Sequence, residues 1–506
     1  SLQDIPLAQI ERIEIVRGPR SSLYGADAIG GVIQVFTRRG KGNAGVRGRA
    51  RIGAGSHGLR EASAGLDLRG ARGGVGLDLG HQSTDGIDSC RGIGAPWYAG
   101  CGMDNPDPDR DGYRNNNVSL RADFAASEAW QFEAQGLRAR GHNFFDADPA
   151  WGLPDNSKVL QQVVGGSVRY RPSQALGLRL TVGRNIDASD NHLGATYMDR
   201  FETRRDSASL QGDFVVADGQ VLTAGFDWLR DSGGVDGPFA SFDTTRGNRA
   251  AFAQYQGRFG AHDLQASLRR DDNDQFGGKT TGGFAWGYGF ADGWRLAASH
   301  ATAFKAPSFN ELYYPFFGNP ALRPESSRSS ELSLGHDGDD WQWQLNAYQT
   351  RTDDLIVYDP TLFIANNIEQ ARIRGVELSA SARLGEWDVR GTLGTLDARN
   401  LSIGTNHGKR LPRRPQRSAR LDLDREFGDF GFGLSGILEA ARWDDVANSL
   451  RVGGYGTLDA RVSWRFARDW TLQATLVNAF DKTYETSAYY NQPGREFGLG
   501  LRWQPK

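Results

Sequence analysis

Large apolar residues occupy every second position of residues 496–503, near the end of the chain. They are Phe497, Leu499, Leu501 and Trp503, and the positions between them hold charged residues or glycine. A period of two places one face of an extended strand in an apolar medium and the other face in a polar one. The same alternation recurs along nearly the whole chain, for example in residues 341–347 and 458–466. It constrains the fold more than any other feature of the sequence.

The alternating segments are too many for one soluble β-sandwich. From Val46 onward the chain holds roughly 22 segments of about ten residues, joined alternately by short turns and long polar loops. A transmembrane barrel has this rhythm, because its turns gather on one rim and its loops on the other. A tandem array of soluble sandwiches, with roughly seven to nine strands each, is the alternative. We expect an all-β fold, a transmembrane β-barrel of about 22 antiparallel strands.

Composition agrees with a barrel and excludes spanning helices. Hydrophobic residues make up 39% of the chain, and no run approaches the ~20 apolar residues that a spanning helix needs. A chain without spanning helices can satisfy every backbone N–H and C=O group in lipid only as a closed sheet. The net charge of −2 argues against a nucleic-acid partner, which would call for a clustered basic face. No catalytic Ser/His/Asp, Cys/His or phosphate-loop arrangement is present, so we expect no enzymatic activity.

The turns and loops can be placed by the breaks in the alternation. Short turns are predicted near residues 70–73, 126–128, 172–176, 217–219, 260–262, 291–293, 337–340, 385–387, 426–429 and 467–469. Longer connections are predicted near residues 84–113, 142–158, 188–203, 231–246, 304–327, 353–372, 398–416 and 442–455. Long loops collected at one end of a barrel are where a ligand would arrive.

The first forty residues do not continue this rhythm. Two short apolar segments, Ile10–Val16 and Val32–Phe36, flank a small, glycine-rich stretch, which predicts a compact element and not a wall strand. We therefore divide the chain into residues 1–42 and a barrel of residues 43–506. The chain starts at Ser1 without an initiator methionine or a signal sequence, so we expect a processed or truncated chain.

The chain contains two cysteines, Cys90 and Cys101, eleven positions apart in one predicted loop. This spacing predicts a local disulfide and thus an oxidising compartment such as the periplasm or the cell exterior. Two unpaired loop thiols are the alternative.

Residues 10–40, IERIEIVRGPRSSLYGADAIGGVIQVFTRRG, resemble the C-terminal end of the plug domain of TonB-dependent outer-membrane receptors. Further segments are similar to motifs of the same family: AFKAPSFNELY at 303–313, NPALRPESS at 319–327, ARIRGVEL at 371–378 and VNAFDKTYE at 477–485. The resemblance implies a plugged barrel surrounded by the lipid of the bacterial outer membrane. It also implies active import, in which the TonB–ExbB–ExbD complex acts through an N-terminal segment, the TonB box, that we expect to be absent from this chain.

Within that family the chain is most similar to vitamin B12 receptors, on DDNDQFG at 271–277 and the ending FDKTYETSAYYNQPGREFGLGLRW. The resemblance implies cobalamin or a related corrinoid as cargo. A ferric siderophore, haem or another metal chelate keeps the same fold and is the nearest alternative. A passive porin, a surface adhesin or a phage receptor is the alternative of another class, and the plug-like segment argues against an open pore.

The resemblance also implies calcium sites that order two outer loops. The segments DADPAWGLPDNSK, SDNHLG and RRDSASL carry the matching carboxylates, which are Asp146, Asp155, Asp190 and Asp206. Calcium takes six to eight oxygen ligands, which carboxylates from two loops could supply. The alternative is that these acidic residues are simply well solvated. The run DPDRDG at 107–112 also imitates the start of a calcium loop, but it lacks the later glutamate and is taken as a turn.

Ligand contacts are carried over at three positions. Arg413, in LPRRPQRSARL, matches a ligand-contacting arginine, with a structural ion pair to a neighbouring acid as the alternative. Two further contact positions fall on Ala250 and Ala447, where the vitamin B12 receptors have polar residues. That departure leaves the identity of the cargo open.

Overall fold

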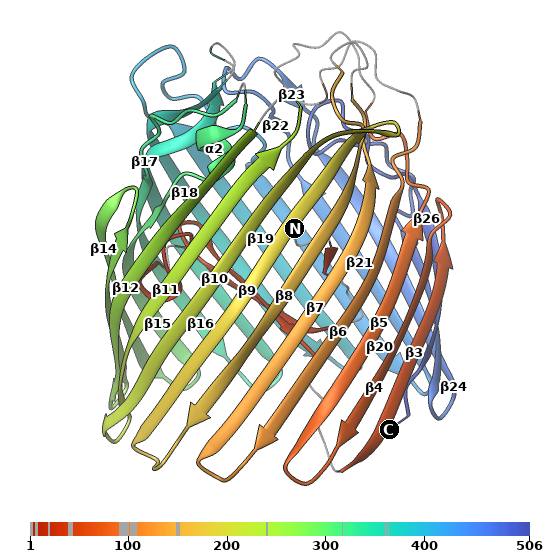
Figure 1. Cartoon of the computed structure of the whole chain (residues 1–506). Helices are drawn as coiled ribbons and strands as arrows, with labels where there is room; N and C mark the ends of the chain where they lie inside the picture. Colours follow the sequence, from red (N-terminus) through yellow and green to blue (C-terminus); the bar gives the residue numbers. More distant parts are fainter. Residues whose placement is uncertain are drawn as a thin grey trace.

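The structure is a computed structural model that describes residues 4–5, 9–18, 21–38, 44–90, 101, 109–147, 152–238, 241–315, 317–359, 362 and 364–505. It is a closed antiparallel barrel of 22 strands (Figure 1), which confirms the predicted fold class. The wall strands are β3 (Gly45–Gly55), β4 (Arg60–Arg69), β5 (Gly73–Thr84), β6 (Tyr113–Ala125), β7 (Trp130–Phe144), β8 (Asn156–Tyr170), β9 (Leu176–Leu193), β10 (Thr196–Ala217), β11 (Gln220–Asp236), β12 (Ser241–Phe259), β13 (His262–Asn273), β14 (Gly277–Ala291), β15 (Trp294–Lys305), β16 (Glu325–Asp337), β17 (Trp341–Asp359), β18 (Ile364–Leu384), β19 (Trp387–Asn400), β20 (Arg417–Phe427), β21 (Phe430–Glu439), β24 (Tyr455–Ala467), β25 (Trp470–Val477) and β26 (Glu496–Trp503). The last strand, β26, pairs with β3 and closes the ring.

The alternation along each strand sorts the side chains between the outer face and the lumen. Leu268 on β13 is 61% exposed on the outer face, whereas its neighbour Arg269 is 1% exposed on the lumen side. Aromatic residues gather at the turn end of the outer face, where Trp294 and Trp343 lie 5.6 Å apart between ring centroids. An apolar outer band with an aromatic girdle is the surface that a lipid bilayer requires. No helix in the described part of the chain is long and apolar enough to cross a membrane.

Each predicted short turn joins two consecutive wall strands, but three of the predicted long loops are largely strand. Residues 188–203, 231–246 and 353–372 belong mostly to the hairpins β9–β10, β11–β12 and β17–β18, in which the backbone ladder continues past the apolar band. The prediction of loops was wrong there because these strand ends rise above the membrane. Their outer face meets water, so the apolar alternation stops while the hydrogen bonding continues.

The N-terminal residues form a small element inside the barrel, shown in red in Figure 1. Strands β1 (Ile10–Arg17) and β2 (Gly31–Thr37) pair as a hairpin, and the short helix α1 (Ser21–Tyr24) lies between them in sequence. The helix contacts β12 to β15, and the Ser21 hydroxyl donates to the Phe304 carbonyl at 3.5 Å. The proposed domain boundary after residue 42 falls at the edge of residues 39–43, which lie outside the described residues, and it stays a prediction.

Candidate functional site

Ion pairs join the N-terminal element to the lumen wall. Arg205 on β10 binds Asp231 on β11, with 2.6 Å between Nε and Oδ1, and its Nη2 donates to Asp27 of the N-terminal element at 3.0 Å. Arg17 of β1 pairs with Glu377 of β18 on another part of the wall. The element is therefore held by charge-assisted hydrogen bonds that can break and reform, because most of these side chains remain partly exposed.

A second contact centres on Arg269 and Asp271, which are buried, while their partner Asp227 is 19% exposed. Arg269 on β13 lies between Asp227 on β11 and Asp271 on its own strand, with 3.0 Å between Nε of Arg269 and Oδ2 of Asp271. Gly25 of the N-terminal element lies against this arginine at a φ of 91°, and a Cβ there would meet Nη2 of Arg269 at 3.4 Å. The left-handed backbone favours glycine at this position. Arg269, Asp227 and Asp271 thus form the charged group of the wall against which the N-terminal element packs.

One of the predicted ligand contacts lies beside these charges. Ala250 on β12 is opposite Asp227 on β11 and Asp271 on β13, and it is 2% exposed. At this exposure the structure gives a ligand no direct access to Ala250.

The lumen contains a cavity of about 890 Å³ between the N-terminal element and β3 to β7. Its lining includes Asp4, Gln9 and Arg38 from the N-terminal element and Tyr113 and Asn115 from β6. Next to it, Arg49 and Arg121 alternate with Asp67 and Asp78 in a closed ring of four ion pairs across β3 to β6. The wall there carries charges that neutralise one another.

Arg413 and Ala447 lie in one group of outer loops. The Arg413 guanidinium donates to Asp444 from Nε at 3.1 Å and from Nη2 at 3.2 Å, and the Asp444 side chain is fully buried. Asp444 also accepts from Ser487 and from the Ala488 amide. Ala447 is exposed between β22 (Arg442–Trp443) and β23 (Arg451–Val452). Asp444 is therefore the neighbouring acid that a structural ion pair of Arg413 requires. About half of the Arg413 side chain, 52%, stays exposed.

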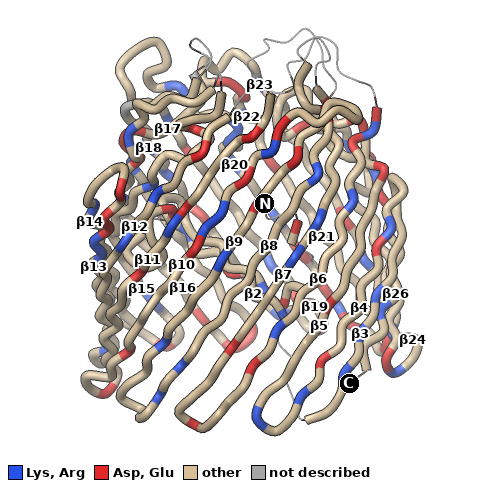
Figure 2. The backbone as a smooth tube through the Cα atoms, in the orientation of Figure 1, with Lys and Arg blue, Asp and Glu red and all other residues tan. Residues whose placement is uncertain are grey.

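The four predicted calcium ligands are not brought together. Asp155 accepts from the Gly194 amide at 2.9 Å, and Asp190 pairs with Arg200 at 2.7 Å. Asp206 pairs with Arg184 and Arg204, and it shares the outward face of β10 with Leu210, which is 52% exposed. Figure 2 shows acidic and basic residues together on the loop side of β9 and β10.

The register also separates two of these acids. Arg200, the partner of Asp190, lies six residues before Asp206 on β10, which is roughly 20 Å of strand. One ion cannot bind both carboxylates across that distance.

Asp146 instead lies close to Asp109 and Asp111, in a segment that the sequence predicts to form a turn. One carboxylate oxygen from each lies within 4.8 Å of the others. Burial, and then the charge of Asp111, raises the pKa of Asp146 to about 7. The signal in the sequence is the alternation of acids in residues 107–112, of which 107 and 108 lie outside the described residues.

The acidic group adjoins the cysteine loop. The Cys90 amide donates to Oδ2 of Asp146 at 2.9 Å, and the Ser89 amide donates to Asp111 at 2.8 Å. Cys90 and Cys101 form a disulfide and are each 1% exposed. The first outer loop is therefore tied both to itself and to the loop that follows β7.

Comparison with known proteins places this architecture in one family. A model of the TonB dependent receptor-like β-barrel matches residues 57–479, and a model of the TonB-dependent receptor plug domain matches residues 1–32. The vitamin B12 transporter BtuB of Photobacterium profundum is 30% identical over 501 residues, which are 97% of this chain and 79% of that protein.

Solved structures show the same fold at lower identity. The copper transporter OprC has a TM-score of 0.81 at 19% identity, covering 98% of this chain and 86% of that one. The siderophore receptor PirA of Acinetobacter baumannii has a TM-score of 0.82 at 17% identity, covering 100% and 86%. Because the barrel model covers most of the chain and the plug model covers its N-terminal element, the chain belongs to the TonB-dependent receptor family of outer-membrane transporters.

Proposed function

We propose that this receptor imports cobalamin or a related corrinoid. The observation that carries the proposal is the 30% identity to a vitamin B12 transporter over almost the full length of the chain. Cobalamin is a large amphipathic ligand, so its site needs many hydrogen-bonding groups together with some aromatic surface. The outer loops offer both kinds of group.

Two loop regions supply these groups. Arg413 and Ser487 converge on Asp444 and leave exposed polar surface beside Ala447. Aromatic rings gather near α2 (Phe309–Tyr313), where Phe242 and Tyr313 lie 5.9 Å apart between centroids and Gln275 donates to the Tyr313 hydroxyl. In this proposal the polar group binds the amide side chains of the corrinoid and the rings cover its apolar faces.

Passage through the lumen then requires the N-terminal element to move. In this proposal TonB and its ExbB–ExbD partners supply the force, and the contacts that yield are Arg205 with Asp27 and Arg17 with Glu377. Both pairs join the N-terminal element to the wall and are partly exposed, so water can replace each bond as it breaks. The buried Arg269 group stays with the wall, because all three of its charges come from β11 and β13.

We also propose that Asp109, Asp111 and Asp146 hold a calcium ion. The residues fit, because Oδ1 of Asp111 and Oδ1 of Asp146 are buried and have no hydrogen-bond partner among the described residues. Calcium would supply positive charge at the point where the three carboxylates converge. The proposal is confined to Asp146 among the predicted ligands, because Asp155, Asp190 and Asp206 already have the partners given above.

Equilibrium binding of cyanocobalamin to the purified receptor carrying its plug domain tests the cargo. A ferric siderophore and haem serve as competitors, and each titration is repeated after chelation of calcium. Tight binding of cyanocobalamin that the competitors do not reduce supports the corrinoid proposal. Tight binding of an iron chelate in its place overturns it. A loss of affinity on chelation supports the calcium proposal separately from the cargo.

A further inference from the structure

A row of arginines crosses the outer face of the barrel on the side of the long loops. Four consecutive strands, β16 to β19, each place one arginine directly opposite the arginine of the next strand. These residues are Arg328, Arg351, Arg372 and Arg399, and Arg410 of the following segment lies opposite Arg399. We call these five residues the arginine row. Like charges placed directly opposite one another on a sheet are destabilising. A row of five is therefore costly unless an anion neutralises it.

The arginine row faces out of the barrel. On β16 Arg328 is in phase with Leu332, and on β18 Arg372 is in phase with Val376, and both apolar residues are exposed on the outer face at 53% and 45%. The lumen side of the same strands carries residues such as Glu377, which pairs with the N-terminal element. The arginines therefore do not face the transport path.

The row lies at the outer edge of the apolar band. On β17, Arg351 is ten residues from Trp341, which belongs to the aromatic girdle at the turn end. Ten residues of a strand tilted by about 40° rise roughly 25 Å, the height of the apolar band of a barrel. The arginines thus meet the head groups of the outer leaflet.

Acidic residues neutralise only part of this row. Asp397 pairs with Arg399 at 2.8 Å and reaches Arg372 at 4.0 Å, while Asp353 lies 3.7 Å from Arg328. Arg351 and Arg410 have no carboxylate partner in the described part of the chain, and Nη1 of Arg410 and Nε of Arg372 are buried without any hydrogen-bond partner there. By contrast, the outward arginines Arg184 and Arg204 of β9 and β10 share Asp206.

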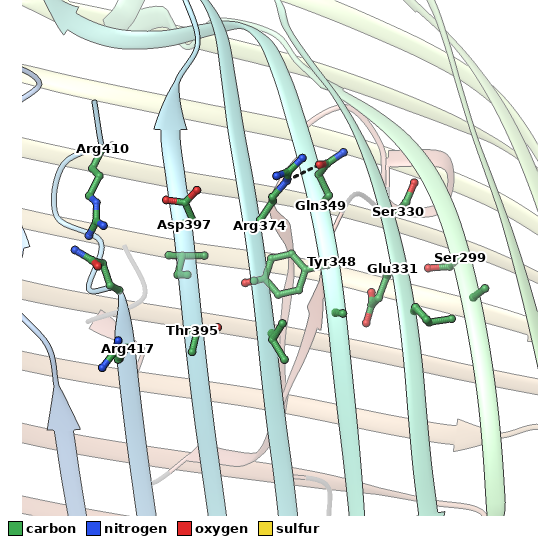
Figure 3. A pocket seen from close by; sticks show the side chains of 17 residues that line it. Ser299, Ser330, Glu331, Tyr348, Gln349, Arg374, Thr395, Asp397, Arg410 and Arg417 are labelled. Carbon is green, nitrogen blue, oxygen red and sulfur yellow. Dashed lines mark hydrogen bonds between the residues drawn. The ribbon is translucent and has the colours of Figure 1, made fainter. Parts of the chain in front are cut away.

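A hollow of about 810 Å³ adjoins the row, because Arg410 of the row lines it together with Arg374, which lies two residues from Arg372 on β18. Figure 3 shows Arg374, Arg410 and Arg417 around it, with Arg374 donating to Gln349. Its floor is made of small residues such as Ala298 and Ala347. A second hollow of about 540 Å³ continues from it through Val376, Leu378 and Leu438 and is mainly apolar. Cationic residues above an apolar groove match an amphiphile with an anionic head and acyl chains.

We propose that the arginine row and these two hollows bind a phosphorylated glycolipid of the outer leaflet, with its phosphates on the arginines and its acyl chains in the apolar hollow. The planar guanidinium binds phosphate through two parallel hydrogen bonds, so one row of arginines can hold more than one phosphate. The bound phosphates would offset the repulsion within the row. This proposal is independent of the cargo, because it concerns the outer face alone.

The test compares a row variant with a matched control. The row variant carries Arg351→Gln, Arg372→Gln and Arg410→Gln, which leaves the Arg399–Asp397 pair in place. The control carries Arg383→Gln, Arg425→Gln and Arg465→Gln, which removes three charges at the turn end of the same wall. Both proteins are checked for the folded barrel by heat-shifted migration in gels. Binding of bisphosphorylated lipid A in detergent is then measured by native mass spectrometry.

We expect the row variant to bind lipid A at least ~10-fold more weakly than the control and the unmodified receptor, since each lost arginine–phosphate bond contributes roughly tenfold. Without lipid A, the row variant should resist heat as well as the unmodified receptor or better, because its like charges are gone. Equal affinity in the row variant and the control overturns the proposal. Two results with the unmodified receptor would also overturn it. If dephosphorylated lipid A binds as tightly as lipid A, the groove alone accounts for binding. If phosphatidylglycerol binds as tightly as lipid A, the site accepts any phosphate lipid.

Discussion

The guanidinium of Arg269 and the carboxylate of Asp271 form an ion pair in which the side chains are 1% and 0% exposed. The two residues lie two positions apart on β13, so they share the lumen face of one strand. Asp227 and the Asn248 amide complete the hydrogen bonding of the pair. The plug-like element rests on this group through Gly25, so the group belongs to the stability of the wall and to the seating of the plug.

Arg269→Gln should destabilise the barrel by ~3–5 kcal/mol, because it leaves the buried Asp271 and the partly buried Asp227 without their cation. The measurement is the free energy of unfolding in urea with refolding into lipid vesicles. Arg270→Gln is the matched control. Its side chain lies on the outer face, where Nη1 donates to Thr280, and its removal should cost less than ~1 kcal/mol. Equal losses in the two variants would contradict the assignment.

Gly25→Ala should loosen the N-terminal element by about 1–2 kcal/mol, because alanine is strained at a φ of 91°. Hydrogen exchange of residues 21–38 should become faster while exchange of the wall strands stays the same. Gly30→Ala is the control, since a Cβ there meets no atom within 4 Å. Unchanged protection in Gly25→Ala would show that the left-handed backbone at this position does not hold the element in place.

The first outer loop should lose stability as the pH rises when calcium is absent. Burial, and then Asp111, raises the pKa of Asp146 to about 7 from an ordinary value of 3.8, so the folded loop keeps a proton that the unfolded loop releases. The stabilisation is complete below the ordinary pKa and is lost as the pH rises through about 7. Exchange of residues 84–90, corrected for the intrinsic rate, measures it. Asp146→Asn should abolish the dependence.

Calcium titration separates the two sets of acids. Asp146→Asn should weaken calcium binding at least ~10-fold in calorimetry, because it removes one of three converging carboxylates. Asp206→Asn should leave the binding isotherm unchanged, since Asp206 lies in an ion pair on the outer face. If calcium binding weakened in Asp206→Asn and not in Asp146→Asn, the result would instead support the ligand set that the resemblance implied.

Part of the site could be read from the sequence, and part could not. The segment at residues 10–40 predicts the plug-like element, because its composition departs from the wall rhythm. Asp206 lies four positions before Leu210 on the same strand, so the alternation alone predicts that its side chain faces outward. Its ion pair with Arg184, however, depends on the register with the neighbouring strand. The meeting of Asp111 with Asp146 depends on two loops folding against each other, which no local pattern records.

The sequence by itself determined the closed barrel, its number of strands and its place in the membrane, because a bilayer imposes a period of two on every strand that crosses it. It did not determine where strands continue above the membrane, since the apolar alternation ends there while the backbone ladder does not. The tertiary structure decided which charges meet. Strand register placed Arg351, Arg372 and Arg399 side by side and Arg269 between two acids. Register is a property of two paired strands, so the sequence of one strand does not show which charges it places beside those of its neighbour.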